Sequence, residues 1–239
     1  MIDLRRADER FHTEIDWLDS WHCFSFSNHY DQKNTHHGLL MVLNDDVIAA
    51  GGGFGTHGHR DMEIVTWVLD GALEHRDSEG NQGVITPGVA QRMSAGTGIR
   101  HSEQNASRAE SVRLLQMWVP PDTMDIAPGY EQHDISSLKR DDELFPLASG
   151  REAEAAIQLH QRDATLWVAT LNAGARVVVP DAPFVHVMVS TGGATFDRTG
   201  ALDAGDALRC TEAGTFDLVA IADGTEVTIW EMWADLEVA

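Results

Sequence analysis

Hydrophobic and polar residues alternate over short stretches along most of the chain. The stretches are rich in Val, Ile, Trp, Thr and Phe, and turn-forming segments such as SEGN (78–81) and ADG (222–224) separate them. This pattern is typical of strands in an all-β sandwich or barrel. Strands are predicted at 62–69, 71–77, 83–88, 114–119, 166–171, 175–180, 184–190, 193–197, 215–222 and 226–233.

One segment has a more helical pattern than the rest of the chain. Residues 141–156 (DDELFPLASGREAEAA) are the best helix candidate, but Pro146 and Gly150 interrupt them. Proline and glycine both disfavour the interior of a helix. The predicted fold class is therefore all-β.

An internal repeat joins two parts of the chain. Segments 68–93 and 189–214 share the order strand, glycine turn, strand, loop, strand, turn, strand. The alignment pairs two turn glycines and one arginine of each copy: Gly71 with Gly193, Gly88 with Gly205, and Arg92 with Arg209. Repeated β units indicate a duplicated β domain, and a single large sandwich is the alternative.

The two copies define an expected domain organisation. The segment from about Ser136 to Ala155 is acidic and poorly patterned, so we expect the boundary there. Residues 1–135 are predicted to form an N-terminal barrel, and residues 136–239 are predicted to form a C-terminal barrel.

Charge and cysteine content narrow the classes of partner. The 239 residues include 17 Lys and Arg against 38 Asp and Glu, a formal net charge of −21. Such a surface repels phosphate backbones and anionic membranes, so we expect neither direct nucleic-acid binding nor membrane binding. No apolar run approaches the ~18 residues of a membrane span, and the N-terminus lacks the apolar core of a signal peptide. Cys23 and Cys210 are expected to be buried reduced thiols in a cytoplasmic protein.

The stretch GFGTHGHRDMEI (53–64) carries the candidate chemistry. Its glycines fit the G-x-G-x-x-G pattern of dinucleotide loops, but such a loop must lead into a helix. A β-branched run follows here instead, which excludes that interpretation. A metal site on a strand remains, with core or surface histidines that have only structural roles as the alternative.

Strand geometry explains the spacing of the histidines. Residues i and i+2 of a strand point to the same face, so His57 and His59 project together. Downstream, His101 and Glu103 repeat the spacing in AGTGIRHSEQN (95–105). If both segments line one barrel, three imidazoles and one carboxylate converge. This set suits Fe, Ni, Co, Mn or Zn better than Ca²⁺.

These motifs resemble those of cupins, which are small jelly-roll barrels. The first cupin motif, G-x5-H-x-H-x3-E, matches Gly51, His57, His59 and Glu63. The second, ending in G-x2-H-x3-N, matches Gly98, His101 and Asn105. Gly96 departs from this pattern, since proline is usual there.

The resemblance is closer to the pirin family of bicupins, which includes quercetin 2,3-dioxygenases. It is carried by WLDSWHCFSFSNHYD (17–31), GFGTHGHRDMEIVTWVLDG (53–71) and MSAGTGIRHSEQN (93–105). Gly58 departs from the family, which usually has proline there. The resemblance implies two tandem cupin barrels and the metal ligands His57, His59, His101 and Glu103. It also implies that Glu63 is not a ligand.

The resemblance further implies a function. A metal-dependent dioxygenase would open the heterocycle of a flavonol such as quercetin with O2 and release CO. Glu103 is the expected catalytic proton acceptor, with Glu63 as the alternative. Fe(II) is the first expectation for the single divalent ion, with Ni, Co, Mn, Cu or Zn as alternatives. The alternative function is an iron-binding, redox-responsive interaction protein that modulates a transcription regulator or a metabolic enzyme.

The remaining histidines leave questions open. His36 and His37 are expected in a polar loop. His22 could serve either packing or the pocket. His186 stands where the second copy could carry a ligand, but it lacks an H-x-H partner, so the C-terminal barrel is expected to have no metal site.

Overall fold

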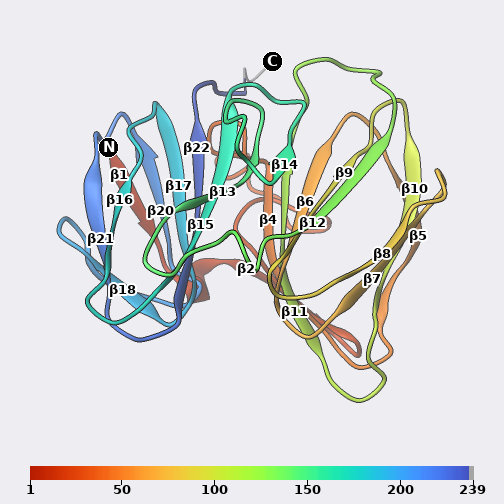
Figure 1. Ribbon diagram of the computed structural model, residues 1–239, viewed down its shortest axis with the longest axis horizontal. Helices are drawn as coiled ribbons and strands as arrows, with labels where there is room; N and C mark the ends of the chain where they lie inside the picture. Colours follow the sequence, from red (N-terminus) through yellow and green to blue (C-terminus); the bar gives the residue numbers. More distant parts are fainter. Residues whose placement is uncertain (237–239) are drawn as a thin grey trace.

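The computed structural model describes residues 1–236 and is built almost entirely of strands (Figure 1). Two seven-stranded and two four-stranded sheets form two barrels side by side. The one helical element of the described residues is the 3-10 turn η1 (Ala7–Glu9). No helix in this part of the chain is long and apolar enough to span a membrane.

Each barrel pairs a seven-stranded sheet with a four-stranded one. The first barrel contains β2 (Phe11–Ile15), β3 (Leu18–His22), β4 (Val42–Ile48), β5 (Gly53–His59), β6 (Glu63–Asp70), β7 (Leu73–Asp77), β8 (Gln82–Ile85), β9 (Val89–Ser94), β10 (Ile99–Asn105), β11 (Val112–Val119) and β12 (Gly129–Asp134). The second contains β1 (Ile2–Arg5), β13 (Phe145–Ser149), β14 (Ile157–Gln158), β15 (Ala164–Leu171), β16 (Arg176–Val179), β17 (Phe184–Thr191), β18 (Gly193–Phe196), β19 (Gly200–Asp203), β20 (Ala207–Thr211), β21 (Phe216–Ala220) and β22 (Thr225–Met232).

The strand orders of the barrels correspond. The large sheets run β12-β9-β6-β11-β4-β3-β2 and β1-β20-β17-β22-β15-β13-β14, and the small sheets run β5-β10-β7-β8 and β16-β21-β18-β19. The prediction of two tandem cupin barrels is therefore confirmed. The repeat alignment was wrong by one residue at the first glycine: the counterpart of Gly71 (φ +80°) is Gly192 (φ +72°), since each begins the turn before the next strand.

The predicted split of the chain differs from the structure at the N-terminus. Residues 1–5 were expected in the first barrel, but β1 pairs with β20 at the edge of the second (Figure 1). β1 occupies the edge place that β12 fills in the first barrel, so the second barrel takes its edge strand from the start of the chain. The boundary near residue 135 stays a prediction.

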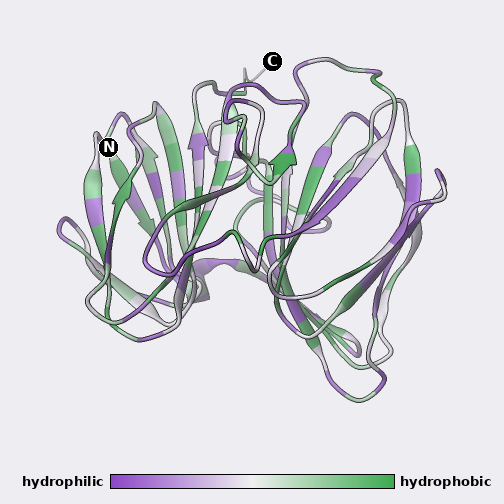
Figure 2. Ribbon diagram, in the orientation of Figure 1, coloured by the Kyte–Doolittle hydropathy of each residue, from purple (hydrophilic) through white to green (hydrophobic). Residues whose placement is uncertain are grey.

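The helix candidate at 141–156 was also wrong. Its central part is β13, which pairs with β15. Hydrophobic and hydrophilic segments alternate along the strands of both barrels (Figure 2), as one buried face per strand requires. Tertiary pairing thus overrode a weak local helical pattern that already contained proline and glycine.

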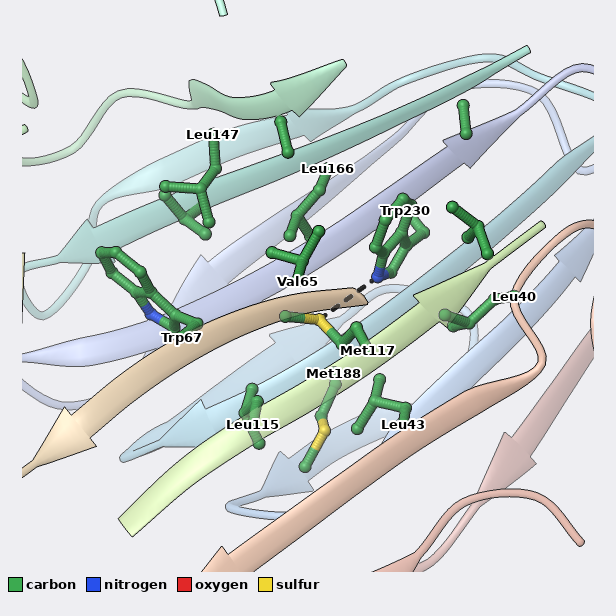
Figure 3. Packing of buried hydrophobic residues seen from close by; sticks show 14 of the residues in the cluster. Leu40, Leu43, Val65, Trp67, Leu115, Met117, Leu147, Leu166, Met188 and Trp230 are labelled. Atoms are coloured by element: carbon green, nitrogen blue, oxygen red, sulfur yellow. Dashed lines mark hydrogen bonds between the residues drawn. The ribbon is translucent and has the colours of Figure 1, made fainter. Parts of the chain in front are cut away.

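A shared apolar core joins the barrels. Side chains of the first barrel, such as Leu43, Val65 and Met117, form one buried cluster with Leu166 and Trp230 of the second (Figure 3). The Trp230 indole N–H faces the Met117 sulfur at 3.3 Å. The outer faces of the large sheets are thereby buried against each other, and their inner faces remain to line the barrel interiors.

Candidate metal centre

The small sheet of the first barrel brings the predicted histidines together. β10 pairs antiparallel with β5, and this register sets His101 opposite His57 and Ile99 opposite His59. Gly53 allows the close approach of the strands, since a Cβ there would lie 2.4 Å from the Glu103 carbonyl oxygen. The two histidine motifs, which were expected to line one barrel, thus lie on neighbouring strands of its small sheet.

The three imidazoles form a compact cluster. Ring centres lie 4.8 Å apart for His57 and His59, 4.4 Å for His57 and His101, and 4.9 Å for His59 and His101. One ring nitrogen of each lies within 4.8 Å of the others. Metal–imidazole bonds are about 2.0–2.1 Å, so small ring rotations would let these nitrogens face one ion.

The protonation state of the cluster favours a cation. Burial lowers the pKa of His59 to about 4 and that of His101 to about 2, and the neighbouring imidazoles add to both shifts. Both rings are therefore neutral near pH 7, as metal ligands must be. The Nε2 atom of His101 is buried without a hydrogen-bond partner, which is the environment expected of a lone pair that binds a metal.

Glu103 belongs to an overlapping cluster. A carboxylate oxygen of Glu103 lies within 4.8 Å of a ring nitrogen of His75 and of His101. His57 and His59 belong to the first cluster, which shares His101 with this one. Both carboxylate oxygens accept hydrogen bonds from Gln116 Nε2, at 3.0 and 2.9 Å. The extra residue of a bulge lies in β5, at Gly55 and Thr56, and sets Glu103 opposite Phe54. β10 itself pairs regularly with β7 across His101 and Glu103, so these two side chains point to the same face.

His75 is a site residue that the sequence reasoning missed. It lies on β7 opposite Glu103, and its Nδ1 is 3.5 Å from His101 Nδ1. Its Nε2 is 3.3 Å from the buried Asp77 carboxylate, and Tyr130 stacks on its ring. The H-x-D spacing in EHRD is the available signal, since it places His75 and Asp77 on one strand face.

Glu63 lies in a different environment. The chain turns at Asp61 (φ +48°) between β5 and β6, so Glu63 begins a strand of the large sheet. Its carboxylate accepts a hydrogen bond from the His160 backbone at 3.1 Å and lies 3.9 Å from Arg92. Glu63 therefore contacts Arg92 on β9 of the large sheet and His160, which lies between β14 and β15 of the second barrel.

A cavity of about 550 Å³ opens onto the cluster. Such a volume lies within the range of small-molecule sites. Apolar and aromatic side chains form a large part of its wall, and His57, His59 and Glu103 also line it. The aromatic and aliphatic lining residues are Ile15, Trp17, Leu18, Phe26, Phe54 and Trp118.

One strip of the cavity wall is polar. Alternate residues of β3 and β4 point inward, which brings together Ser20, His22, Asn44 and Asp46. His22 Nδ1 lies 2.9 Å from Asn44 Oδ1, so His22 lines the pocket and is fixed there. Burial raises the pKa of Asp46 to about 7, and Ser20 hydrogen-bonds to its carboxyl group.

The second barrel carries apolar side chains at the corresponding positions. Its registers match His57 with Val179, His101 with Phe216, Glu103 with Leu218 and His75 with Phe196. All four belong to one buried apolar cluster, and the Phe196 and Phe216 rings are 4.1 Å apart. The expectation that His186 stands at a ligand position was wrong, because β17 corresponds to β6 and His186 to Val65.

The two cysteines and His37 pack against other parts of the protein, away from the histidine cluster. Cys23 and Cys210 are free and buried. His37 Nε2 lies 3.1 Å from the Cys210 carbonyl oxygen, so this part of the expected polar loop packs on the second barrel.

Comparison with known proteins agrees with this architecture. A family model described as Pirin matches residues 4–119. A Mycobacterium tuberculosis protein provisionally named as a quercetin 2,3-dioxygenase is 51% identical over 236 residues, which are 98% of this chain and 96% of the relative. Quercetin 2,3-dioxygenase of Escherichia coli K12 is 53% identical over 139 residues, 58% of this chain and 60% of the relative.

A solved structure covers both barrels. The bacterial pirin YhhW of Escherichia coli, in complex with nickel(II), superposes with a TM-score of 0.89 at 37% identity over 99% of this chain and 100% of that one. With half of all residues identical across nearly the full length of the mycobacterial relative, and the same two-barrel fold, this chain belongs to the pirin family.

Proposed function

We propose that the protein is a metal-dependent dioxygenase that opens the heterocycle of flavonols such as quercetin with O2 and releases CO. The carrying observation is the three-imidazole cluster beside a cavity of about 550 Å³ with an aromatic wall. A flat polyhydroxylated aromatic substrate suits such a wall, and its hydroxyl groups suit the strip formed by Ser20, His22, Asn44 and Asp46.

A divalent metal fits the residues present. His57, His59 and His101 would hold it, with Glu103 as the fourth ligand, and the buried unpartnered Nε2 of His101 supports this assignment. The donor set suits Fe(II) and also Ni, Co, Mn, Cu or Zn. When bound, the ion would supply the positive charge that lowers the pKa of a substrate hydroxyl and the redox chemistry with O2.

The chain's own groups orient the substrate and move its proton. Glu103 lies at the cavity wall, where Gln116 fixes its carboxylate, so we assign to it the acceptance of the flavonol 3-hydroxyl proton. Trp17, Phe54 and Trp118 would cover the rings of the substrate and exclude water.

The test is anaerobic reconstitution of metal-stripped protein with each candidate ion in turn, followed by oxygen uptake and CO detection with quercetin. We expect quercetin-dependent uptake with at least one ion and stoichiometric CO. The variant His57→Gln should abolish it. His133→Gln is the matched control, because His133 is 55% exposed on β12 and pairs with Glu131. Absence of quercetin-dependent uptake with every ion would refute the proposal.

The cavity favours the enzyme over the alternative of an interaction protein. An exposed apolar patch beside the metal site would favour a partner-binding function. Among residues 1–236, the large exposed hydrophobic side chains are spread over separate elements, for example Tyr30, Val84, Leu138 and Val178. Ile15 is the one that also lines the cavity.

A further inference from the structure

A second, small cavity lies where the two barrels meet. Its volume is about 20 Å³, enough for one ordered water or one ion of similar size. Residues of both barrels line it, including Cys23 from the first and His186 and Arg209 from the second. Four arginines of a chain with net charge −21 surround this one space: Arg5, Arg6, Arg10 and Arg209.

Arg209 is a buried charge without a carboxylate partner. Its Nη2 donates to the Cys23 carbonyl at 2.7 Å, its guanidinium lies 4.3 Å from the centre of the Phe24 ring, and its Nε has no hydrogen-bond partner. No Asp or Glu of residues 1–236 forms an ion pair with it within 4.0 Å. Burial lowers the pKa of Arg209 only to about 10, so it is charged at neutral pH. A buried charge is costly unless an opposite charge compensates it.

In the first barrel, the arginine at the position equivalent to Arg209 has its charge balanced by carboxylates. The counterpart of Arg209 in the first barrel is Arg92, which is also buried. Arg92 Nη2 donates to Glu131 on the edge strand β12 at 2.9 Å, and its Nε lies 3.9 Å from Glu63 on β6. Two carboxylates therefore face this arginine.

Both carboxylates are lost around Arg209. The register of β1 against β20 makes Asp3 the counterpart of Glu131, and that of β17 makes Phe184 the counterpart of Glu63. Asp3 is one methylene shorter and pairs instead with Arg5 at 2.7 Å, with its side chain 44% exposed. The second barrel thus retains the arginine without its counter-charges.

The other arginines of the cavity do not leave a free carboxylate. Each has one partner: Arg5 with Asp3, Arg6 with Asp206, and Arg10 with Asp45. Asp45 also pairs with Arg113 at 2.9 Å. Each of these carboxylates is therefore already paired with an arginine other than Arg209, and the lining Glu9 accepts a hydrogen bond from the Arg6 backbone N–H at 3.1 Å.

His186 supplies a polar group at the same place. It lies opposite Arg209 in the pairing of β17 with β20, is 1% exposed, and has no hydrogen-bond partner on either ring nitrogen. A neutral imidazole has one N–H donor, and in this cavity that donor lacks an acceptor. An arginine and an imidazole donor thus both lack an anionic acceptor.

We propose that this cavity binds one monovalent anion of halide size, chloride under ordinary conditions, between Arg209 and His186. The anion takes the place of the carboxylates that balance Arg92 in the first barrel. Since Cys23 and Arg209 come from different barrels, the bound anion also stabilises the contact between them.

The first test locates the anion in the wild-type protein. Crystals grown with bromide in place of chloride should show an anomalous peak within hydrogen-bonding distance of the Arg209 guanidinium. A cavity that holds only water in bromide-grown crystals would overturn the proposal.

The second test measures the linkage to stability. Melting is followed as chloride replaces gluconate at constant ionic strength, since gluconate is too large for about 20 Å³. Above the dissociation constant, each tenfold rise in chloride should raise Tm by about 3 to 6 °C. Equal Tm values in chloride and gluconate would contradict anion binding.

Amino-acid substitutions test whether the chloride dependence of Tm arises from this cavity. Asp3→Glu restores the side-chain length of Glu131 and should remove most of the chloride dependence, because an internal carboxylate then neutralises Arg209. Asp217→Glu is the matched control on the exposed pair with Arg176 and should keep the dependence. Arg209→Met should also lose it. If Arg209→Met does not fold, Asp3→Glu still decides, and a chloride dependence unchanged in Asp3→Glu would count against the site.

Discussion

Glu63 and Glu103 are both buried, yet they face different neighbours. Glu63 contacts His160 and Arg92, whereas Glu103 is held by Gln116 at the wall of the cavity. The contrast arises from the turn at Asp61, which transfers the chain from the small sheet to the large one. Residue type alone therefore does not assign a carboxylate to the metal cluster.

The two glutamates should respond differently to the loss of charge. Glu103→Gln should weaken metal binding and abolish quercetin-dependent oxygen uptake, because the carboxylate is the proposed fourth ligand and proton acceptor. Glu63→Gln should keep the metal. Metal content per chain and oxygen uptake measure both. Loss of metal in Glu63→Gln together with retention in Glu103→Gln would reverse the assignment.

Asp46 should make the stability of the metal-free protein depend on pH. Its folded pKa of about 7 exceeds its unfolded value of 3.8, so its contribution is fully present below about pH 3.8 and is lost as pH rises to about 7. Asp46→Asn lacks this titration. The unfolding free energy of the variant relative to wild type should rise by roughly 2 to 3 kcal/mol between pH 5 and pH 8.

Urea unfolding at the two pH values measures this difference. Asp70→Asn is the control, because Asp70 is exposed at the end of β6 and should show little change. A pH-independent difference between wild type and Asp46→Asn would mean that Asp46 is ionised throughout this range.

Corresponding strands of the two barrels have diverged in what they enclose. β7 and β10 carry His75, His101 and Glu103 beside a cavity, whereas β18 and β21 carry Phe196 and Phe216 in close contact. β7 pairs with β10 in the same way as β18 pairs with β21, so the side chains on these strands separate a candidate metal centre from an apolar core.

Phe216→Ala should therefore affect stability without affecting metal. Removal of a buried aromatic ring costs about 3–5 kcal/mol of unfolding free energy. Metal content should equal that of wild type, since Phe216 lies in the second barrel. Denaturant unfolding and metal analysis check the two parts, and a loss of metal from Phe216→Ala would show that the barrels share the site.

The whole molecule is held by the core between its large sheets. Trp230 is completely buried there, and Trp67 of the first barrel donates a hydrogen bond to Glu226 of the second at 2.6 Å. An interface of this kind couples the barrels, because neither large sheet can expose its outer face without losing apolar burial.

We therefore expect one unfolding transition in calorimetry for the wild-type protein. Trp230→Ala should lower the unfolding free energy by about 3–5 kcal/mol. Trp233→Ala is the matched control: Trp233 is 44% exposed and should cost less than about 1 kcal/mol. Two separate transitions in wild type would show that the barrels unfold independently.

Much of the architecture follows from local sequence pattern. Alternation of apolar residues predicts the strands, and the repeated glycine turns predict two similar barrels. The same period of two places His57 with His59 on one face, since neighbouring positions on a strand must point to opposite sides. These features depend on backbone geometry within a few residues, so they can be predicted from the sequence alone.

Only the tertiary structure decided which distant groups meet. The position of β1 beside β20, the contact of His75 with His101, the direction of Glu63 and the unbalanced charge of Arg209 all depend on pairing between strands far apart in sequence. Such pairing is set by the burial of whole sheet faces, and a one-residue shift in register would move every side chain of a strand to the other face. The spacing of residues along the chain carries no direct information about these contacts.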